Sequence, residues 1–250
     1  MRALLAFFTV LPVAAPGSSL EAAARRAFLL PLVGLLAGLP GAGLLLLAFV
    51  APPGVAATLA LGAALLAAGL HHTDGVMDVG DALMVRGSSA RRREVLKDAR
   101  TGAGAVGALF VVYGPSLAAL AALAADSPLR ASVALLTGEV AARSAMLLLL
   151  VFGKPATDSS SSAYFVHALK EGRRRAAALI LALALPSLVA LSLGPVALLV
   201  TLVVLVATVL LALALVRRAF GGIGGDVSGA TGELTRAVLL VALSIVVGSY

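Results

Sequence analysis

Long apolar runs dominate this chain, and they restrict its fold more than any other feature. Only 12% of the 250 residues are charged, whereas about 25% is usual for a soluble domain. A helix that crosses a hydrocarbon core of about 30 Å needs roughly 20 mostly apolar residues. We expect about seven spans, near residues 27–50, 55–70, 103–125, 129–151, 176–192, 195–216 and 237–248. The sequence therefore predicts an all-α, polytopic membrane helix bundle, with residues 1–250 forming a single integral-membrane domain.

The first apolar run, residues 3–11, is too short to cross a membrane and ends at Pro12. We interpret it as a short interfacial or re-entrant segment. A signal peptide cleaved after Ala14-Ala15-Pro16 is the alternative. Because the chain has no cysteine, disulfides and thiolate metal sites are excluded.

The basic residues fall almost entirely in the loops on one side of such a bundle. Of the 19 Lys and Arg residues, only Arg130 lies in a loop on the other side, and Arg143 lies inside a span; Arg236 is assigned to a basic loop. The positive-inside rule makes the basic side cytoplasmic. We expect a multi-pass protein of the cell membrane with a cytoplasmic N-terminus and Tyr250 outside. Its arginine clusters, residues 91–93 and 173–175, would contact lipid headgroups, with ligand binding as the alternative, and no nucleic acid is expected as a partner.

The most acidic stretch, residues 71–81, follows the second span directly. In a helix, Asp74, Asp78 and Asp81 would lie within an arc of about 60°, with His71 on the same face. The opposite face would pack against apolar surroundings through Val76, Val79 and Leu83. Carboxylates this close raise one another's pKa unless a cation lies among them, so the pattern predicts a Mg²⁺ site. A solvated helix end is the alternative for the aspartates, and an interfacial hydrogen bond for His71.

A second polar segment contains groups that suit a phosphate. Ser88 or Ser89 would cap a short helix that ends near Lys97, Asp98 and Arg100. The free backbone N–H groups of residues 101–104, together with the guanidinium, would then form an anion site for a diphosphate.

Two further patterns are candidates for substrate binding. Residues 221–233 contain six glycines, and we expect a loop there in which the backbone approaches a ligand while Asp226 and Glu233 complete a metal or sugar site. A flexible loop is the alternative. Glu139 and Arg143 lie at i and i+4 in the fourth span, either as a structural pair facing the bundle interior or as a substrate contact.

Together, three of these motifs resemble those of the cobalamin synthase family, in an order and spacing that match over nearly the whole chain. They are Asp74-Gly75-x-x-Asp78-x-x-Asp81, Lys97-Asp98-Ala99-Arg100-Thr101-Gly102 and Gly221-Gly222-x-x-Gly225-Asp226-x-x-Gly229-Ala230. Ala99 stands where the family has a serine, and Val76, Met77, Val79 and Ala82 replace the usual neighbours of the aspartates. These departures remove no charged group.

The resemblance implies a membrane enzyme of late vitamin B12 assembly. Such an enzyme transfers the adenosylcobinamide phosphate moiety from adenosylcobinamide-GDP to α-ribazole or its 5′-phosphate and releases GMP. Asp74, Asp78 and Asp81 would bind Mg²⁺, and Asp81, His71, Lys97 and Arg100 would act in catalysis. The expected substrate-binding residues are Asp98, Gly102, Gly222, Gly225, Asp226, Glu233 and Arg143. Association into a homo-oligomer stays open.

Two other functions are consistent with aspartates at a membrane helix end. A CDP-alcohol phosphotransferase would need Ala-Arg after the Asp-Gly-x-x segment, where Asp78-Val79 stands. A cation transporter would need carboxylates near the membrane midplane on several spans, and only Glu139 is so placed.

Overall fold

The structure, a computed structural model, describes residues 1–13, 20–156 and 160–248. The segment Ala14-Ala15-Pro16 and Tyr250, which entered the sequence interpretation, lie outside the described residues. Within those residues the chain is almost entirely helical, and the one β-type pairing is an isolated bridge between Pro155 and Ile223.

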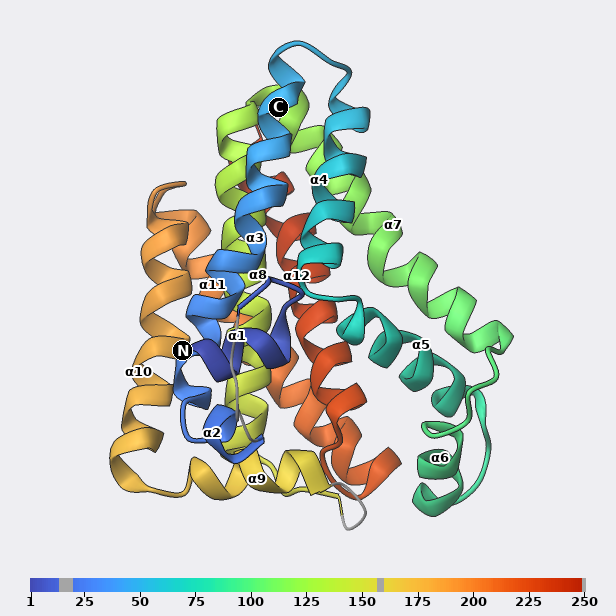
Figure 1. The fold of residues 1–250 in the computed structure, drawn as a ribbon. Coiled ribbons are helices and arrows are strands. Elements are labelled where there is room, and N and C mark those ends of the chain that lie inside the picture. The colour runs from blue at the N-terminus through green and yellow to red at the C-terminus, as the bar shows by residue number, and fades with distance from the viewer. Residues whose placement is uncertain (14–19, 157–159, 249–250) are drawn as a thin grey trace.

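Long helices form an upright bundle (Figure 1). They are α3 (Leu30–Leu45), α4 (Pro53–Ala67), α7 (Ala103–Asp126), α8 (Pro128–Phe152), α10 (Gly172–Leu191), α11 (Pro195–Leu215) and α12 (Gly225–Val247). Short turns, Ala27–Leu29, Leu46–Phe49 and Val216–Phe220, extend α3 at both ends and α11 at its C-terminus. Six helical segments are long and apolar enough to cross a membrane, and α4 meets this test only together with the bent helix that follows it. The all-α polytopic fold is confirmed, and the chain is a multi-pass membrane protein.

Five shorter helices complete the fold: α1 (Arg2–Phe8), α2 (Leu20–Ala24), α5 (His71–Met84), α6 (Ser89–Val95) and α9 (Ser160–Ala168). In Figure 1, α2, α6 and α9 lie at the lower end of the bundle, and the C-terminus lies at the upper end. As expected, α1 is too short to span. Its Leu4 is fully buried, and the following Val10 donates a backbone hydrogen bond to Ala67 at the end of α4 (3.0 Å).

The second span ends at Ala67, three residues earlier than predicted, because the chain turns sharply there. Gly69 and Leu70 both have left-handed backbone (φ 74° and 60°), and α5 leaves α4 at 94°. In a non-glycine residue this conformation costs about 1–2 kcal/mol. The turn directs α5 across the bundle instead of along it, so α5 lies outside the six spans.

The predicted loop at residues 221–233 and the short seventh span are wrong, because α12 already begins at Gly225. Glycine lowers helix propensity by about 1 kcal/mol, but here it permits close packing. A Cβ at Gly229 would lie 3.1 Å from the Cα of His72, and a Cβ at Gly232 would lie 3.1 Å from the carbonyl oxygen of Ala142. Tertiary contacts with α5 and α8 therefore override the local preference for a loop.

The prediction that Arg236 lies in a basic loop is also wrong. This residue lies in the middle of α12 with no exposed surface, and it forms ion pairs with Glu139 and Glu233. It is therefore a charge of the bundle interior, not of a basic loop. The triple-arginine segments of α6 and of the first turn of α10 both lie at the lower end of the bundle, on opposite sides of it (Figure 1).

Candidate active site

The predicted carboxylate face forms on α5, and the N-terminal end of α12 approaches it. Asp74 and Asp78 lie on α5, which is helical as expected, and Asp226 lies in the first turn of α12. The two helices touch at Gly75, where a Cβ would lie only 2.6 Å from the carbonyl oxygen of Asp226. The absence of a side chain at Gly75 thus allows Asp226 to reach the acidic face. On the opposite face, Val76 and Val79 are buried as predicted, but Leu83 is 37% exposed.

Electrostatic repulsion is built into this carboxylate cluster, which we define as Asp74, Asp78 and Asp226. Partial burial of Asp78 raises the pKa of its carboxyl group to about 6, and the negative charges of Asp74, Asp226 and Asp81 act in the same direction. The surroundings of Asp78 therefore oppose its ionisation at neutral pH. A bound cation would reverse this effect.

The donor chemistry of the cluster suits Mg²⁺, which prefers carboxylate oxygens, phosphate oxygens and water. Among the residues that the structure describes, no three Asp, Glu or His side chains lie close enough together to hold an ion by themselves. Mg²⁺ often takes only one or two protein carboxylates and completes its shell with substrate phosphates and waters. The chemistry of the donor set, carboxylates beside a cavity, thus fits an ion shared with a phosphate-bearing substrate.

Asp81 has a different environment from the other two aspartates of the motif. Its carboxylate accepts hydrogen bonds from the backbone N–H groups of Gly102 (2.7 Å) and Ala105 (2.9 Å) at the start of α7. The expectation that the backbone N–H groups of residues 101–104 are free for a diphosphate is therefore wrong for Gly102. Because a carboxylate at a helix N-terminus is favourable, Asp81 joins α5 to α7.

The second motif divides between two cavities. Lys97 lines a small cavity of about 230 Å³ together with Arg93, Gly222, Gly225 and Asp226. We call it the basic cavity, and it brings residues of the second and third motifs together.

Asp98 and Arg100 lie elsewhere, along a cavity of about 910 Å³ between α5 and α7, with Asp81 and Gly102. The Arg100 guanidinium donates hydrogen bonds to Asp98 (Nη2–Oδ2, 2.8 Å) and lowers the pKa of that carboxyl to about 2. The helix before them, α6, is capped by Ser88 as predicted, since Ser88 Oγ accepts a hydrogen bond from the backbone N–H of Arg91.

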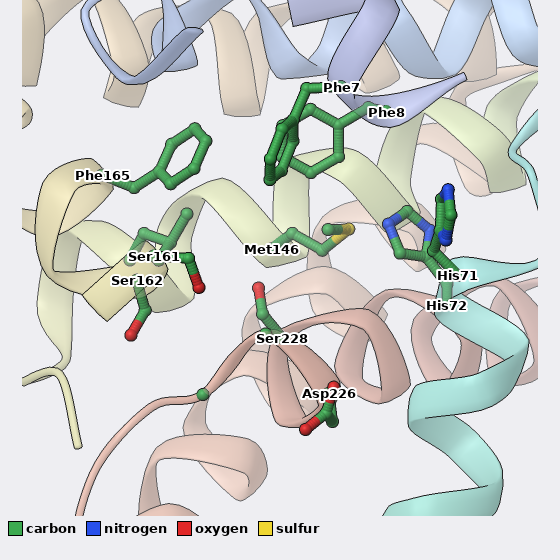
Figure 2. A pocket seen from close by; sticks show the side chains of 13 residues that line it. Phe7, Phe8, His71, His72, Met146, Ser161, Ser162, Phe165, Asp226 and Ser228 are labelled. Atoms are coloured by element: carbon green, nitrogen blue, oxygen red, sulfur yellow. The ribbon is translucent and has the colours of Figure 1, made fainter. Parts of the chain in front are cut away.

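A third cavity, of about 330 Å³, was not predicted. Figure 2 shows the three phenylalanines that line it, Phe7 and Phe8 from α1 and Phe165 from α9. His71, His72, Met146, Ser161, Ser228 and Asp226 are also among the lining residues. We call it the aromatic cavity. It shares Gly224, Gly225, Asp226 and Ser161 with the basic cavity, so the two cavities adjoin at the start of α12.

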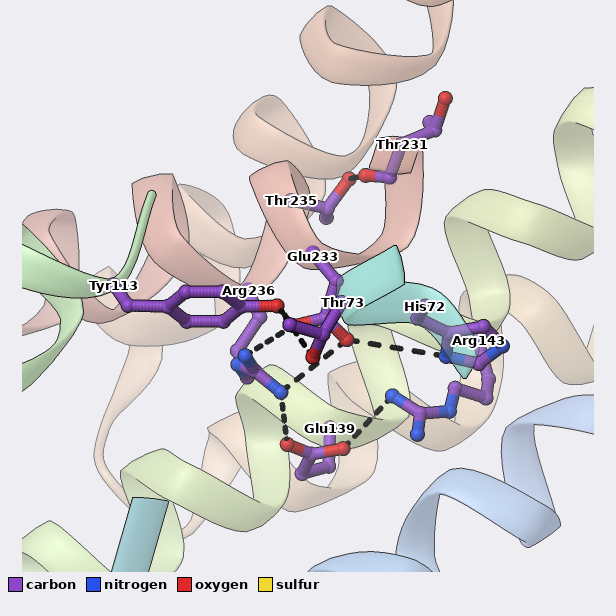
Figure 3. A network of polar contacts seen from close by, with 9 residues as sticks. All are labelled: His72, Thr73, Tyr113, Glu139, Arg143, Thr231, Glu233, Thr235 and Arg236. Carbon is purple, nitrogen blue, oxygen red and sulfur yellow. Dashed lines mark hydrogen bonds and ion pairs between the residues drawn. The ribbon is translucent and has the colours of Figure 1, made fainter. Parts of the chain in front are cut away.

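A buried polar network lies inside the bundle, beside the N-terminal turn of α5 (Figure 3). Glu139 on α8 accepts hydrogen bonds from Arg143 (2.8 Å) and Arg236 (2.7 Å), and Arg236 also pairs with Glu233. These four side chains have no exposed surface. Their two negative and two positive charges balance, as burial in an apolar bundle requires.

The network also reaches α5 and α7. The Tyr113 hydroxyl lies 3.0 Å from Glu233 Oε2 and 3.0 Å from Thr73 Oγ1. Because a carboxylate can only accept, Tyr113 donates to Glu233 and accepts from Thr73. Arg143 thus forms the structural pair with Glu139 and has no geometry of a substrate contact. Glu233 belongs to the network and does not line the aromatic or the basic cavity. The pairing of Glu139 with two arginines also argues against a cation path through it.

Comparison with known proteins identifies the family of this chain. A family model described as cobalamin-5-phosphate synthase matches residues 1–244. The chain belongs to the cobalamin-5-phosphate synthase family. Its members are enzymes of cobalamin synthesis, and this chain is accordingly a transferase of that pathway, as the three motifs indicated.

Relatives in this family match the chain over nearly its full length. A protein of Halorubrum lacusprofundi named adenosylcobinamide-GDP ribazoletransferase is 38% identical over 97% of this chain and 95% of its own. Proteins of the same name from Thermoplasma volcanium and Bradyrhizobium diazoefficiens are 32% and 35% identical, over 98% and 99% of this chain and 90% and 94% of their own. No solved structure gives a significant match.

Proposed function

We propose that this enzyme transfers the adenosylcobinamide phosphate moiety of adenosylcobinamide-GDP to α-ribazole or its 5′-phosphate and releases GMP. The relatives carry the corresponding name. The observation that most directly supports the proposal is the convergence of two surfaces at Asp226. This residue belongs to the carboxylate cluster and also lines the basic cavity with Lys97 and Arg93. A cation beside one surface and cationic side chains on the other would enclose a diphosphate.

In this proposal one or two carboxylates of the cluster formed by Asp74, Asp78 and Asp226 would hold Mg²⁺ together with diphosphate oxygens. When bound, the ion would neutralise charge on the diphosphate and stabilise the leaving GMP. Lys97 would bind a phosphate oxygen from the basic cavity, and Gly222 and Gly225 leave space for the diphosphate beside it. Asp81 would act through position, since its oxygens hold the start of α7 against α5.

The transfer forms one bond and breaks another at the same phosphorus. The acceptor hydroxyl oxygen attacks the phosphorus that carries adenosylcobinamide, the bond from this phosphorus to the GMP oxygen breaks, and GMP leaves with that oxygen. The hydroxyl proton passes to a nearby base. His71 is exposed at the rim of the aromatic cavity and could accept it, as could a carboxylate of the cluster.

We place the site at the cytoplasmic face of the cell membrane, with the N-terminus in the cytoplasm. The support for this orientation is the position of the arginine-rich segments of α6 and α10 at the lower end of the bundle, the end at which α12 begins (Figure 1).

The test uses detergent-purified full-length protein with adenosylcobinamide-GDP, α-ribazole and Mg²⁺. We expect GMP and a cobalamin product, formed in proportion, and loss of both when EDTA removes the metal. Asp78→Asn should lower the rate by about 100-fold or more. Glu94→Gln is the matched control, because Glu94 forms an exposed ion pair with Arg91 and lines none of the three cavities. If Asp78→Asn retained full Mg²⁺-dependent transfer, the metal assignment would be wrong.

A further inference from the structure

The aromatic cavity has a lining unlike that of the basic cavity beside it. The Phe7 and Phe8 rings meet nearly edge to face at 4.9 Å, and Phe8 and Phe165 do so at 5.7 Å. Met146 and Leu150 extend the apolar lining, and the His72 ring lies 6.2 Å from that of Phe8. Aromatic walls of this kind suit a flat aromatic ligand, which stacks on them or meets them edge to face.

Among the described residues that line this cavity, two have a buried polar atom without a hydrogen-bond partner, namely His72 Nδ1, which lies 3.9 Å from Glu233 of the buried network, and Ser228 Oγ. Ser228 is 5% exposed, and its Oγ forms no hydrogen bond. Figure 2 shows this hydroxyl directed from α12 toward Met146 and the phenylalanines. Buried hydroxyl groups are nearly always hydrogen-bonded, so an unpaired one in a cavity lining indicates a place for a polar atom of a ligand.

The size and polarity of the cavity select among the aromatic groups of the two substrates. A corrin ring system is far larger than about 330 Å³. Guanine carries several hydrogen-bonding groups along its edge, and a mostly apolar lining would leave most of them unpaired. A benzimidazole-like base has an apolar bicyclic ring and one free ring nitrogen, which a single hydroxyl donor can satisfy.

The position of the cavity is also suitable for an acceptor. It adjoins the basic cavity through Gly224, Gly225 and Asp226. A nucleoside whose base lies among the phenylalanines would extend its ribose toward Asp226. The proposed binding site of the donor's diphosphate is beside this residue.

We propose that the aromatic cavity binds the base of the nucleoside acceptor, with Phe8 and Phe165 as its aromatic walls and Ser228 Oγ as its hydrogen-bond donor. This inference rests on the proposed function, because it assumes a nucleoside acceptor. It assigns specificity for the base to α1, α9 and α12, outside the acidic motif.

Steady-state kinetics with each substrate varied separately test the assignment. Phe165→Leu and Phe165→Ala should raise the KM for α-ribazole by about tenfold, the size expected for loss of one stacking contact. Ser228→Ala should raise it by a similar factor, because it removes one hydrogen bond. The KM for adenosylcobinamide-GDP and kcat should stay within about twofold of wild type. Tyr164→Ala is the control, since Tyr164 neighbours Phe165 on α9, is 50% exposed and does not line the cavity. A rise in the donor KM alone would assign the cavity to guanine, and unchanged constants in all variants would also overturn the proposal.

A direct binding measurement separates this inference from the proposed function. The chain contains no tryptophan, so Phe165→Trp introduces a single fluorophore at the cavity and Tyr164→Trp provides an exposed control. We expect saturable quenching of the first variant by α-ribazole, without donor or Mg²⁺, and none by GMP. Saturable quenching in a preparation with no transferase activity would refute only the proposed function. Active wild type combined with no quenching and an unchanged acceptor KM would refute only the cavity assignment.

Discussion

The buried network and the carboxylate cluster use charge in opposite ways although they share α12. Glu233 lies two turns after Asp226, in a network where each carboxylate meets an arginine. Asp226 lies instead beside Asp74 and Asp78, and the pKa of Asp78 is raised to about 6. Because an unpaired charge inside an apolar bundle is costly, the network holds helices together. In the cluster, packing at Gly75 holds like charges close together. A bound cation would relieve their repulsion.

The largest expected effect on stability comes from breaking the network. Arg236→Met leaves Glu139 and Glu233 without their shared partner, and losing one member of a buried ion pair costs about 3–5 kcal/mol. We expect a strongly lowered Tm of the detergent-purified protein, or failure to accumulate in the membrane. Arg91→Met is the control, because its exposed pair with Glu94 is worth at most about 1 kcal/mol. If Arg236→Met had the same Tm as wild type, the network would not stabilise the bundle.

The cluster should give the opposite result, a loss of activity with little loss of stability. Asp226→Asn removes one carboxylate from the wall shared with the basic cavity, and we expect about 100-fold lower kcat/KM at limiting Mg²⁺. Raising the Mg²⁺ concentration should recover part of the rate, because the remaining carboxylates still attract the ion. Glu233→Gln, two turns along the same helix, should instead lower the Tm. If both variants changed Tm alone, the distinction between the two regions would fail.

Much of this arrangement could be predicted from the sequence, for identifiable reasons. The helical face of Asp74 and Asp78 follows from spacing alone, and so does the i, i+4 pair of Glu139 and Arg143. Arg236 could not be placed, since its partner Glu139 lies on another helix and the glycines before it favour a loop by local propensity. The capping of α7 by Asp81 likewise depends on which helix end packs beside α5.

The aromatic cavity shows a second limit of sequence reasoning. Phe8 and Phe165 are far apart in the chain and belong to none of the three motifs, so no spacing rule connects them. A weak signal existed, since the chain has only eight phenylalanines and two adjacent ones lie in a segment too short to span.

Close helix packing gives the next prediction, at the point where the cluster is assembled. In Gly75→Ala the new Cβ would lie 2.6 Å from the backbone of Asp226, so α5 and α12 must separate. Overpacking of this kind costs about 1–3 kcal/mol, and activity should fall more steeply than stability because Asp226 moves away from Asp74. Gly107→Ala on α7 is the matched control, since a Cβ there meets no atom within 4 Å. Equal activity in the two variants would argue against a site built across the contact between α5 and α12.

A smaller effect is expected from relief of the repulsion at Asp78. Its pKa is raised from 3.8 to about 6 in the folded protein, so the folded state binds this proton more tightly than the unfolded chain does. Wild type should therefore lose stability as the pH rises from about 4 to about 6, by about 1 kcal/mol once partial solvent exposure is considered.

Asp78→Asn should remove this loss and melt higher than wild type at pH 7.5 but not at pH 4. Added Mg²⁺ should narrow the difference at pH 7.5 by stabilising wild type alone. A variant that melted lower than wild type at pH 7.5 would show that Asp78 is paired with a cation in the folded protein.

The smallest predicted effect concerns the hydroxyl that connects the two regions. Tyr113→Phe removes the bridge between Glu233 and Thr73, the residue that precedes Asp74. Loss of one such hydrogen bond costs about 1 kcal/mol, and the cation–π contact between Arg236 and the ring (5.6 Å) should remain. We expect a Tm lower by a few degrees, together with a several-fold loss of kcat, because the first turn of α5 is no longer held to the network. The exposed Tyr164→Phe should change neither quantity. A Tyr113→Phe variant with the lower Tm but wild-type kcat would show that the network stabilises the bundle without positioning the carboxylate cluster.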